Sequence, residues 1–529
     1  MIDFSHHLAV PDERAQYSPS SDFGTRVLAS TQRRKDSHMK NRASVLALAA
    51  LAVAFPVSAD GDQEIEFSAV VKRTSGVGWG TVANALNPHC SDIDNQGQFA
   101  GDNTRLYSYE LRQGHTQTQV QQVLTSMVAA GTLVYGEANY TAHAVNGQTG
   151  SLWVSDVGIG AAQYHDQYAG QLLGLTAAHN FTLGQGVTIA VLDSGVDPTH
   201  EAVRGPHSVF QWDFVGHDAN PLDEGDGIDN DNDGVTDDGV GHGTYVTSLI
   251  RLVAPQARLM HLRVLDDEGR ADAFTVAEAI DSAVAHGAQV INVSASTGFN
   301  SAALAEAVAH ANQAGVIVIS AMGNDNVAVP LALEYPAALA ESFAICATGH
   351  ADTKAEFSNW GTAADFSAPG ASLVSAGGVY SPTTSVLGAV PGEGYAHWNG
   401  TSLSVAFMSG AAALIRSQYP TLPSAEIPAP LVPDFVMGRL SQSAVSIDAL
   451  NPSYVGGLGV GRANVAAATL LGAPAPIVGD IDHDGFITSS DLLFILAGWG
   501  PCQDDACVGD LDGNAVVDGL DLSRLFSQW

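Results

Sequence analysis

Residues 187–193 read VTIAVLD, a short run of apolar and β-branched residues that ends on a carboxylate. Similar runs follow in ARLMHLRVL (257–265), AQVINVS (288–294) and GVIVIS (315–320). Between them, FTVAEAIDSAVAHG and SAALAEAVAHANQAG have helical spacing and close on Gly287 and Gly315. Apolar strands that alternate with helices predict an α/β domain whose parallel sheet is covered on both faces. Functional residues gather at the carboxyl ends of such strands.

The composition indicates a large globular protein. Of 529 residues, 46% are apolar and 15% charged, so we expect several domains with a substantial core. Asp and Glu number 56 against 21 Lys and Arg, which gives a formal net charge of −35. Nucleic-acid binding needs a basic surface, so this charge argues against it and suits an exported or cation-binding protein.

The N-terminal region has the order of a secretory signal peptide. Residues 39–42 are a short basic start, residues 43–55 an apolar run, and residues 57–59 a small-residue cleavage site. This run is too short for a membrane span, and we find no other segment that is long and apolar enough. We therefore expect residues 1–59 to be a leader, with residues 1–38 as an upstream extension, and the protein to be secreted.

Three motifs carry a candidate catalytic site. Asp193 ends the first strand, His242 lies between glycines in GVGHGT, and Ser402 lies in NGTSL at the start of an apolar helix. A buried carboxylate has to be paired, and a serine at a helix start is either a cap or a nucleophile. A single histidine among 18 means little. The three motifs together indicate an Asp-His-Ser triad.

The chain resembles the subtilisin-like serine proteases, which share this order of residues. Supporting motifs are VAPQARLMHLRVLD (253–266), AMGNDN (321–326), FSNWG (357–361), DFSAPG (365–370) and GVGRANVAAA (459–468). The resemblance implies a three-layer α/β fold with a central parallel sheet over residues 151–471, and an endopeptidase that cleaves proteins or peptides. It places Asn324 in the oxyanion hole, whereas the alternative is a loop asparagine in a turn.

Departures from the family pattern leave the substrate preference open. Leu403 and Ala406 replace the usual Met and Pro after the serine, and Ser296 replaces a glycine at the rim of the specificity pocket. The resemblance implies these substrate-binding residues: Ser294, Ala295, Ser296, Ala321, Met322 and Gly323. The altered rim favours one rival, a catalytically silent binding protein with the same fold. A second rival, an acid-acting relative with a Ser-Glu-Asp site, would not need the His242 motif.

Residues 60–150 form a separate unit. A strand, a helix and a second strand are predicted over residues 106–144, LYSYELRQGHTQTQVQQVLTSMVAAGTLVYGEANYTAHA. VVKRTSG (70–76) and VYGEANYTAHA (134–144) resemble the inhibitory pro-region of secreted subtilisin-like proteases. The resemblance implies a small α+β pro-region and an enzyme made as a zymogen, and the alternative is an unrelated N-terminal domain.

An acidic segment, DGIDNDNDGVTDD (226–238), precedes His242. It fits the first part of an EF-hand loop, although Val240 stands where the usual Glu belongs. Adjacent carboxylates repel one another unless a cation joins them, so we expect Ca²⁺ here rather than a solvated loop. The expected ligands are Asp229, Asp231, Asp233 and Asp237.

Past a linker at 472–478, residues 479–529 repeat at a period of 30. DIDHDGFITSSD (480–491) and DLDGNAVVDGLD (510–521) each fit a calcium loop before a short apolar helix, although Ala515 replaces the bend glycine of the second loop. The repeats resemble type I dockerin modules, which implies a small all-α unit that binds a cohesin-like partner. A calcium-stabilised cap without a partner is the alternative. The expected ligands are Asp480, Asp482, Asp484, Asp491, Asp510, Asp512, Asn514, Asp518 and Asp521.

Two further expectations concern the tail and the four cysteines. In the tail, Leu492, Leu493 and Ile495 should pack against Leu522, Leu525 and Phe526. Cys502 and Cys507 are close enough for a disulfide in an oxidising compartment. Cys346, in the apolar run FAICA, fits a buried free thiol, and Cys90 belongs to the N-terminal unit.

Overall fold

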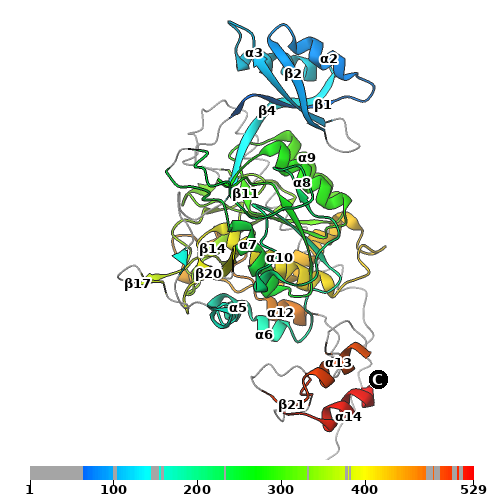
Figure 1. Ribbon diagram of the computed structural model, residues 1–529, viewed down its shortest axis with the longest axis vertical. Coiled ribbons are helices and arrows are strands. Elements are labelled where there is room, and N and C mark those ends of the chain that lie inside the picture. The colour runs from blue at the N-terminus through cyan, green and yellow to red at the C-terminus, as the bar shows by residue number, and fades with distance from the viewer. Residues whose placement is uncertain are drawn as a thin grey trace, which may run out of the picture.

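Figure 1 shows a computed structural model of the chain. The structure describes residues 64–98, 104–144, 154–155, 160–231, 234–329, 333–375, 379–380, 383–392, 394–471, 481, 489–502, 509–511 and 516–528. The expected leader and linker lie outside these residues and stay predictions. Within the described residues, no helix is long and apolar enough to cross a membrane.

The central sheet has seven parallel strands in the order β16-β14-β12-β10-β6-β8-β7. Four of them, β6, β8, β10 and β12, form at the apolar runs in which the sequence predicts strands. The bounds are β6 Thr188–Asp193, β7 Trp212–Asp213, β8 Arg258–Arg263, β10 Val290–Val293, β12 Ile317–Ala321, β14 Ser342–Thr348 and β16 Phe366–Pro369.

Helices cover both faces of this sheet, as the sequence predicts (Figure 1). Ile189 and Val191 of β6 belong to the core under α7 (His242–Val253) and α10 (Thr401–Ser417). The alternate residues, Ala190 and Leu192, belong to the core under α8 (Ala273–Ala285) and α9 (Ala302–Gln313). Successive side chains of a strand point to opposite faces, so a strand that is apolar throughout is buried on both.

Glycines end the two helices on the second face. Gly287 and Gly315 follow α8 and α9 with φ values of +83° and +84°. Glycine adopts this left-handed conformation without the steric cost of a side chain, which stops each helix where the sequence predicts.

The N-terminal unit is a small α+β structure with its own core. Its elements are β1 Glu64–Arg73, α2 Trp79–Leu86, β2 Cys90–Gln98, β3 Thr104–Leu111, α3 Gln117–Ala129 and β4 Leu133–Ala144. The expected strand-helix-strand order over 106–144 appears as β3, α3 and β4. The last residues of β4 leave this unit and pair with strands of the large domain (Figure 1).

The C-terminal repeats contain α13 (Ser489–Ala497), β21 (Gly500–Pro501), β22 (Val516–Val517) and α14 (Gly519–Gln528). The expectation of an all-α unit is therefore incomplete, because β21 and β22 pair between the helices. Ile495 and Leu525 are buried as expected, but Leu493 is 65% exposed and Phe526 52% exposed. Helices this short turn only one face inward, so part of each apolar set stays outside.

The remaining helices and strands surround these layers. They are β5 Val154–Ser155, α4 Ala161–His165, α5 Tyr168–Leu173, α6 Leu175–Ala178, η1 Glu201–Val203, β9 Arg270–Asp272, β11 Ala295–Ser296, β13 Ala328–Val329, β15 Trp360–Gly361, β17 Val374–Ser375, β18 Val379–Tyr380, β19 Leu387–Val390, β20 Gly394–His397, η2 Ala429–Leu431, α11 Val432–Ser443, η3 Asp448–Leu450 and α12 Val465–Leu470.

Candidate active site

Three distant segments bring Asp193, His242 and Ser402 together. Asp193 ends β6, His242 begins α7, and Ser402 is the second residue of α10. His242 Nδ1 lies 2.7 Å from Asp193 Oδ1, and His242 Nε2 lies 3.0 Å from Ser402 Oγ. All three residues are at most 1% exposed. The side chains therefore form one buried hydrogen-bonded series.

The hydrogen-bond partners of His242 indicate the tautomer of its imidazole. The Asp193 carboxylate can only accept hydrogen bonds, and Oδ1 already accepts one from Ser194 N at 2.8 Å. His242 Nδ1 therefore carries the proton, and Nε2 presents a lone pair to the Ser402 hydroxyl. A base aligned in this way on a hydroxyl is the arrangement that activates a nucleophile.

Ser402 does not cap its helix. The N-cap of α10 is Gly400, and no side chain caps this end. The Ser402 hydroxyl instead faces His242 at the positive end of the helix. Leu403 and Ala406, where the family usually has Met and Pro, are fully buried in the core under the sheet. These two departures therefore concern packing.

Asp223 is a buried residue that sequence reasoning missed. Its Oδ1 accepts hydrogen bonds from Ser194 Oγ and Gly241 N, and its Oδ2 from Thr244 N and Thr244 Oγ1. Ser194 follows the aspartate that ends β6, and Gly241 and Thr244 flank His242. One carboxylate thus ties together the two segments that carry the acid and the imidazole. Burial raises the pKa of Asp223, while these hydrogen bonds oppose the increase.

An aromatic cluster covers the imidazole. The Trp398 ring meets His242 edge to face, with centroids 5.4 Å apart, and meets Tyr245 in the same way at 5.7 Å. Trp398 is 3% exposed, and Tyr245 OH donates to Val386 O at 2.9 Å. Edge-to-face contacts stabilise aromatic pairs, so Trp398 holds the ring of His242 in place and excludes water from it.

In the side-chain amide of Asn324, the oxygen is hydrogen-bonded and the nitrogen is not. Its Oδ1 accepts hydrogen bonds from Thr401 N and Thr401 Oγ1, both at 3.0 Å. Both bonds fix the orientation of the Asn324 amide, and Thr401, which donates them, directly precedes Ser402 in the chain. The donor Nδ2 is buried and has no hydrogen-bond partner within the described residues. An unpaired buried donor costs about 1–3 kcal/mol, which calls for a functional explanation.

The end of β4 lies as a third strand between β9 and β11. Ala144 pairs with Ala295 and His143 with Ser296 in an antiparallel register. On its other side, residues 141–143 pair with β9, and Ala144 N donates to Gly269 O at 2.7 Å. The end of β4 is therefore hydrogen-bonded on both sides by strands of the large domain, and the space between β9 and β11 is called the cleft below.

The substrate-binding residues implied by the resemblance divide between β11 and the end of β12. Ser294, Ala295 and Ser296 are at most 3% exposed, and Ser296 pairs with the inserted strand. Ala321 and Met322 are each 1% exposed at the end of β12. Gly323 follows with φ +100°, and a side chain there would collide with Asn359. These segments approach the site from neighbouring strands.

Comparison with known proteins agrees with this geometry. The subtilase family model matches residues 184–445. Subtilisin BL of Lederbergia lenta is 32% identical over 305 residues, which cover 55% of this chain and 94% of that protein. The chain belongs to the subtilase family. Thermitase of Thermoactinomyces vulgaris is 30% identical over 262 residues, 48% of this chain and 82% of thermitase. The relatives identify this subtilase as a serine-type endopeptidase.

The likeness in fold extends to a solved structure. Fervidolysin from Fervidobacterium pennivorans, described as a keratinolytic enzyme related to subtilisin, superposes with a TM-score of 0.57 at 19% identity. The match covers 79% of this chain and 62% of fervidolysin. At this identity it supports the subtilisin-like fold alone.

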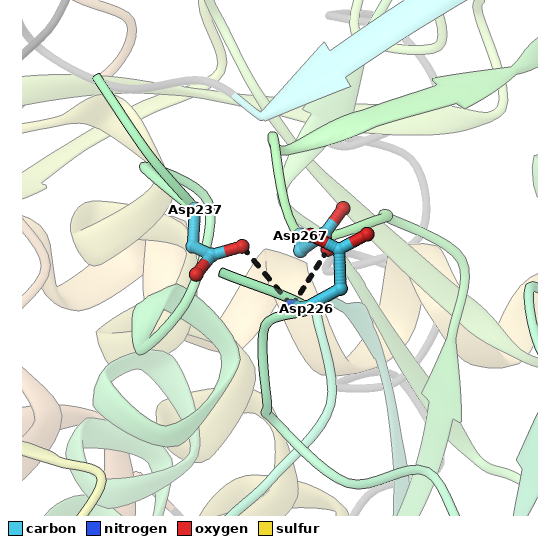
Figure 2. A group of neighbouring side chains, drawn as sticks. All are labelled: Asp226, Asp237 and Asp267. Carbon is cyan, nitrogen blue, oxygen red and sulfur yellow. Dashed lines mark hydrogen bonds between the residues drawn. The ribbon is translucent and has the colours of Figure 1, made fainter. Parts of the chain in front are cut away.

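The acidic segment of this subtilase divides into two groups of carboxylates. Asp226, Asp237 and Asp267 form the first group, and Figure 2 shows the backbone of Asp226 bonded to the other two side chains. Asp229 and Asp231 form the second group with Glu268. In each group, one carboxylate oxygen from each residue lies within 4.8 Å of those from the other two.

This division differs from the single loop that the sequence predicts, and the ligand set stays a prediction. Asp237 belongs with Asp226 instead of with Asp229 and Asp231, and Asp233 lies outside the described residues. Asp267 and Glu268 lie in the turn after β8, so the sequence of the acidic segment could not show that they lie beside it. Burial and the nearby carboxylates of Asp231 and Asp267 raise the pKa of Glu268. Hydrogen bonds from the backbone N–H groups of Asn230 and Asp238 oppose this increase. An oxygen-only, carboxylate-rich set fits Ca²⁺.

The described part of the tail repeats one contact. Ile481 N donates to Asp491 Oδ1 at 2.6 Å, and Leu511 N donates to Asp521 Oδ1 at 2.7 Å. Asp518 N also donates to Asp521, and Asp510 is half-buried. The expected ligands outside the described residues are Asp480, Asp482, Asp484, Asp512 and Asn514.

The described cysteines include both free thiols and a disulfide-bonded residue. Cys90 and Cys346 are buried free thiols, as expected for Cys346. Cys502 is disulfide-bonded, and its expected partner, Cys507, lies outside the described residues.

Proposed function

We propose that this subtilase cleaves peptide bonds through a triad of Asp193, His242 and Ser402. Ser402 Oγ attacks the carbonyl carbon as His242 Nε2 takes its proton, and the imidazolium then returns that proton to the leaving amine. Water hydrolyses the acyl-enzyme by the same route. Asp193 keeps the imidazole in the required tautomer and stabilises its charged form. The observation that carries this proposal is the hydrogen-bonded series from Asp193 Oδ1 to Ser402 Oγ.

Asn324 supplies a donor to the oxyanion. Its carbonyl end is already held by Thr401, so its Nδ2 points to one place only and needs no reorganisation during the reaction. A donor fixed before the charge forms stabilises the transition state more than the ground state. The buried and unpartnered Nδ2 supports this role.

The N-terminal unit, assigned to residues 60–150, is an inhibitory pro-region. Substrates of this cleft would add as a strand between β9 and β11, and the end of β4 takes that place. Outside the cleft, Glu137 accepts hydrogen bonds from Ser301 Oγ and Ala302 N at the start of α9, and Lys72 pairs with Glu306 at 2.6 Å. These contacts support a zymogen that matures by cleavage beyond β4.

The chain is a secreted enzyme that binds calcium, and a dockerin-like tail tethers it to a cohesin-like or surface partner. The order of the leader supports export, and the repeated Asp491 and Asp521 contacts support two equivalent calcium loops. Exposed apolar side chains on α13 and α14, among them Leu493 and Leu520, support a docking face. Each loop would hold Ca²⁺, which neutralises its crowded carboxylates.

A fluorophosphonate probe tests the enzyme assignment directly. The probe should label Ser402 in the mature protein, and Ser402→Ala should lose labelling, hydrolysis and self-maturation together. Ser404→Ala, two residues along the same helix, is the matched control and should still be labelled and mature. Labelling at another residue would overturn the triad. An intact parent protein that takes no label would support the catalytically silent binding protein.

A further inference from the structure

The strand in the cleft turns alternate side chains toward the large domain. Ala142 and Ala144 are 2% and 9% exposed, and both belong to the core under α8 and α9. Thr141 and His143 are only half-buried. Successive side chains of a strand point to opposite faces. Tyr140 therefore stands on the same face of the strand as Ala142 and Ala144.

The ring of Tyr140 stacks on the ring of Phe299 in the large domain. The two ring centroids lie 4.4 Å apart, and the ring planes differ by 11°. Phe299 stands three residues past the end of β11, and Tyr140 directly precedes the residues that pair with β9. The stacked rings therefore lie just beyond the paired part of the strand, on the side away from Ala144.

Contacts within the large domain hold Phe299 in place. Thr297 is fully buried and exchanges two backbone hydrogen bonds with Tyr335, at 3.0 and 2.8 Å. Phe299 N donates to Thr297 Oγ1 at 3.3 Å, and Phe299 O accepts from Ser301 N at 3.0 Å. The backbone that carries the ring is thus fixed without help from the N-terminal unit.

Phe299 is an apolar surface that the N-terminal unit covers. The residue is only half-buried even with Tyr140 stacked on it, so departure of the N-terminal unit exposes the ring further. When a peptide adds as a strand, its main-chain bonds give affinity and its alternate side chains give specificity. A fixed ring beside such a strand binds an aromatic partner at little cost in ordering.

We propose that Phe299 forms an extended subsite that binds an aromatic side chain of the peptide substrate. The side chain stands where Tyr140 stands in the N-terminal unit, four residues before the position of Ala144. This inference rests on the proposed function, in which substrates occupy the place of β4. The stacking contact forms in the bound ground state and persists in the transition state, so it should lower KM and leave kcat nearly unchanged.

Internally quenched peptides test the subsite on the matured parent protein. The reference peptide carries residues 138–152 of the chain, which include Tyr140 and the segment beyond β4. The Tyr140→Ala peptide should raise KM about two- to tenfold, the range expected for the loss of one aromatic pair. The Tyr140→Phe peptide should match the reference. A peptide in which Tyr140 and Thr141 are exchanged has the same composition but turns the ring to the other face of the strand, so it should resemble the Tyr140→Ala peptide.

Variants of the protein assign the effect to Phe299. In Phe299→Ala, the ratio of the KM values for the Tyr140→Ala and reference peptides should fall toward one. Phe299→Tyr keeps a ring and should keep the ratio. Phe299→Leu preserves apolar bulk for folding but has no ring, so it should lose most of the ratio as well. Each ratio compares two peptides on the same protein, so a smaller yield of active enzyme does not affect it.

The outcomes separate the subsite from the proposed function. An active parent with equal KM values for the reference and Tyr140→Ala peptides would overturn the subsite alone. A ratio that survives in both Phe299→Ala and Phe299→Leu would show that Phe299 serves only the docked N-terminal unit, and would also overturn it. A parent that hydrolyses none of the peptides would refute the proposed function and this inference with it.

Discussion

Replacing Asn324 with alanine removes the donor that we propose for the oxyanion. The lost Nδ2 has no hydrogen-bond partner in the described ground state, so its removal should leave KM nearly unchanged. One oxyanion donor is worth about 2.7–4 kcal/mol, so kcat should fall by about 10²–10³. Initial rates on an internally quenched peptide, measured above and below KM, separate the two constants.

The substitution also removes the two hydrogen bonds from Thr401, which is a structural effect to be separated. At about 0.5–1.5 kcal/mol each, these bonds should lower the free energy of unfolding by about 1–3 kcal/mol. Asn324→Asp keeps the acceptor and lacks the donor, so it should retain more stability and lose at least as much kcat. A loss confined to KM, or an Asp variant with normal kcat, would refute the oxyanion role.

Three further predictions concern other parts of the chain. Burial raises the pKa of Glu137 when the N-terminal unit is docked. Docking should therefore be strongest below the pKa of the undocked Glu137 and should weaken as the pH rises through the pKa of the docked residue. Glu137→Gln should flatten this pH dependence of the inhibition constant, and an unchanged slope would contradict the assignment. Deleting residues 479–529 should leave peptide hydrolysis near normal and abolish retention on a calcium-loaded surface partner; a large fall in kcat/KM would contradict a tethering tail. Burial raises the pKa of Cys346 to about 12, so the native protein should resist iodoacetamide at this residue and react only when unfolded, as mass spectrometry would show.

Local patterns were sufficient for the layers and the candidate triad. An apolar run such as 187–193 is typical of a parallel-sheet strand that is buried on both faces, and helical spacing with a terminal glycine predicts where α8 and α9 stop. Asp193, His242 and Ser402 each stand in a short motif whose residue types already limit their chemistry. Such signals lie within about a dozen residues, so they are readable before the chain folds.

The pairings across the site came only from the tertiary structure. Glu268, which lies close to Asp229 and Asp231, stands 28 residues beyond Val240, and nothing in the acidic segment points to it. Asp223, Trp398 and the division of the acidic segment were invisible for the same reason. The sequence also placed Leu493 in the core of the tail, but this side chain lies on the exposed face of α13. The type of a residue determines what its side chain is able to bind. Which partner it meets depends on the distant segments that the sheet and its helices bring within a few ångströms of it.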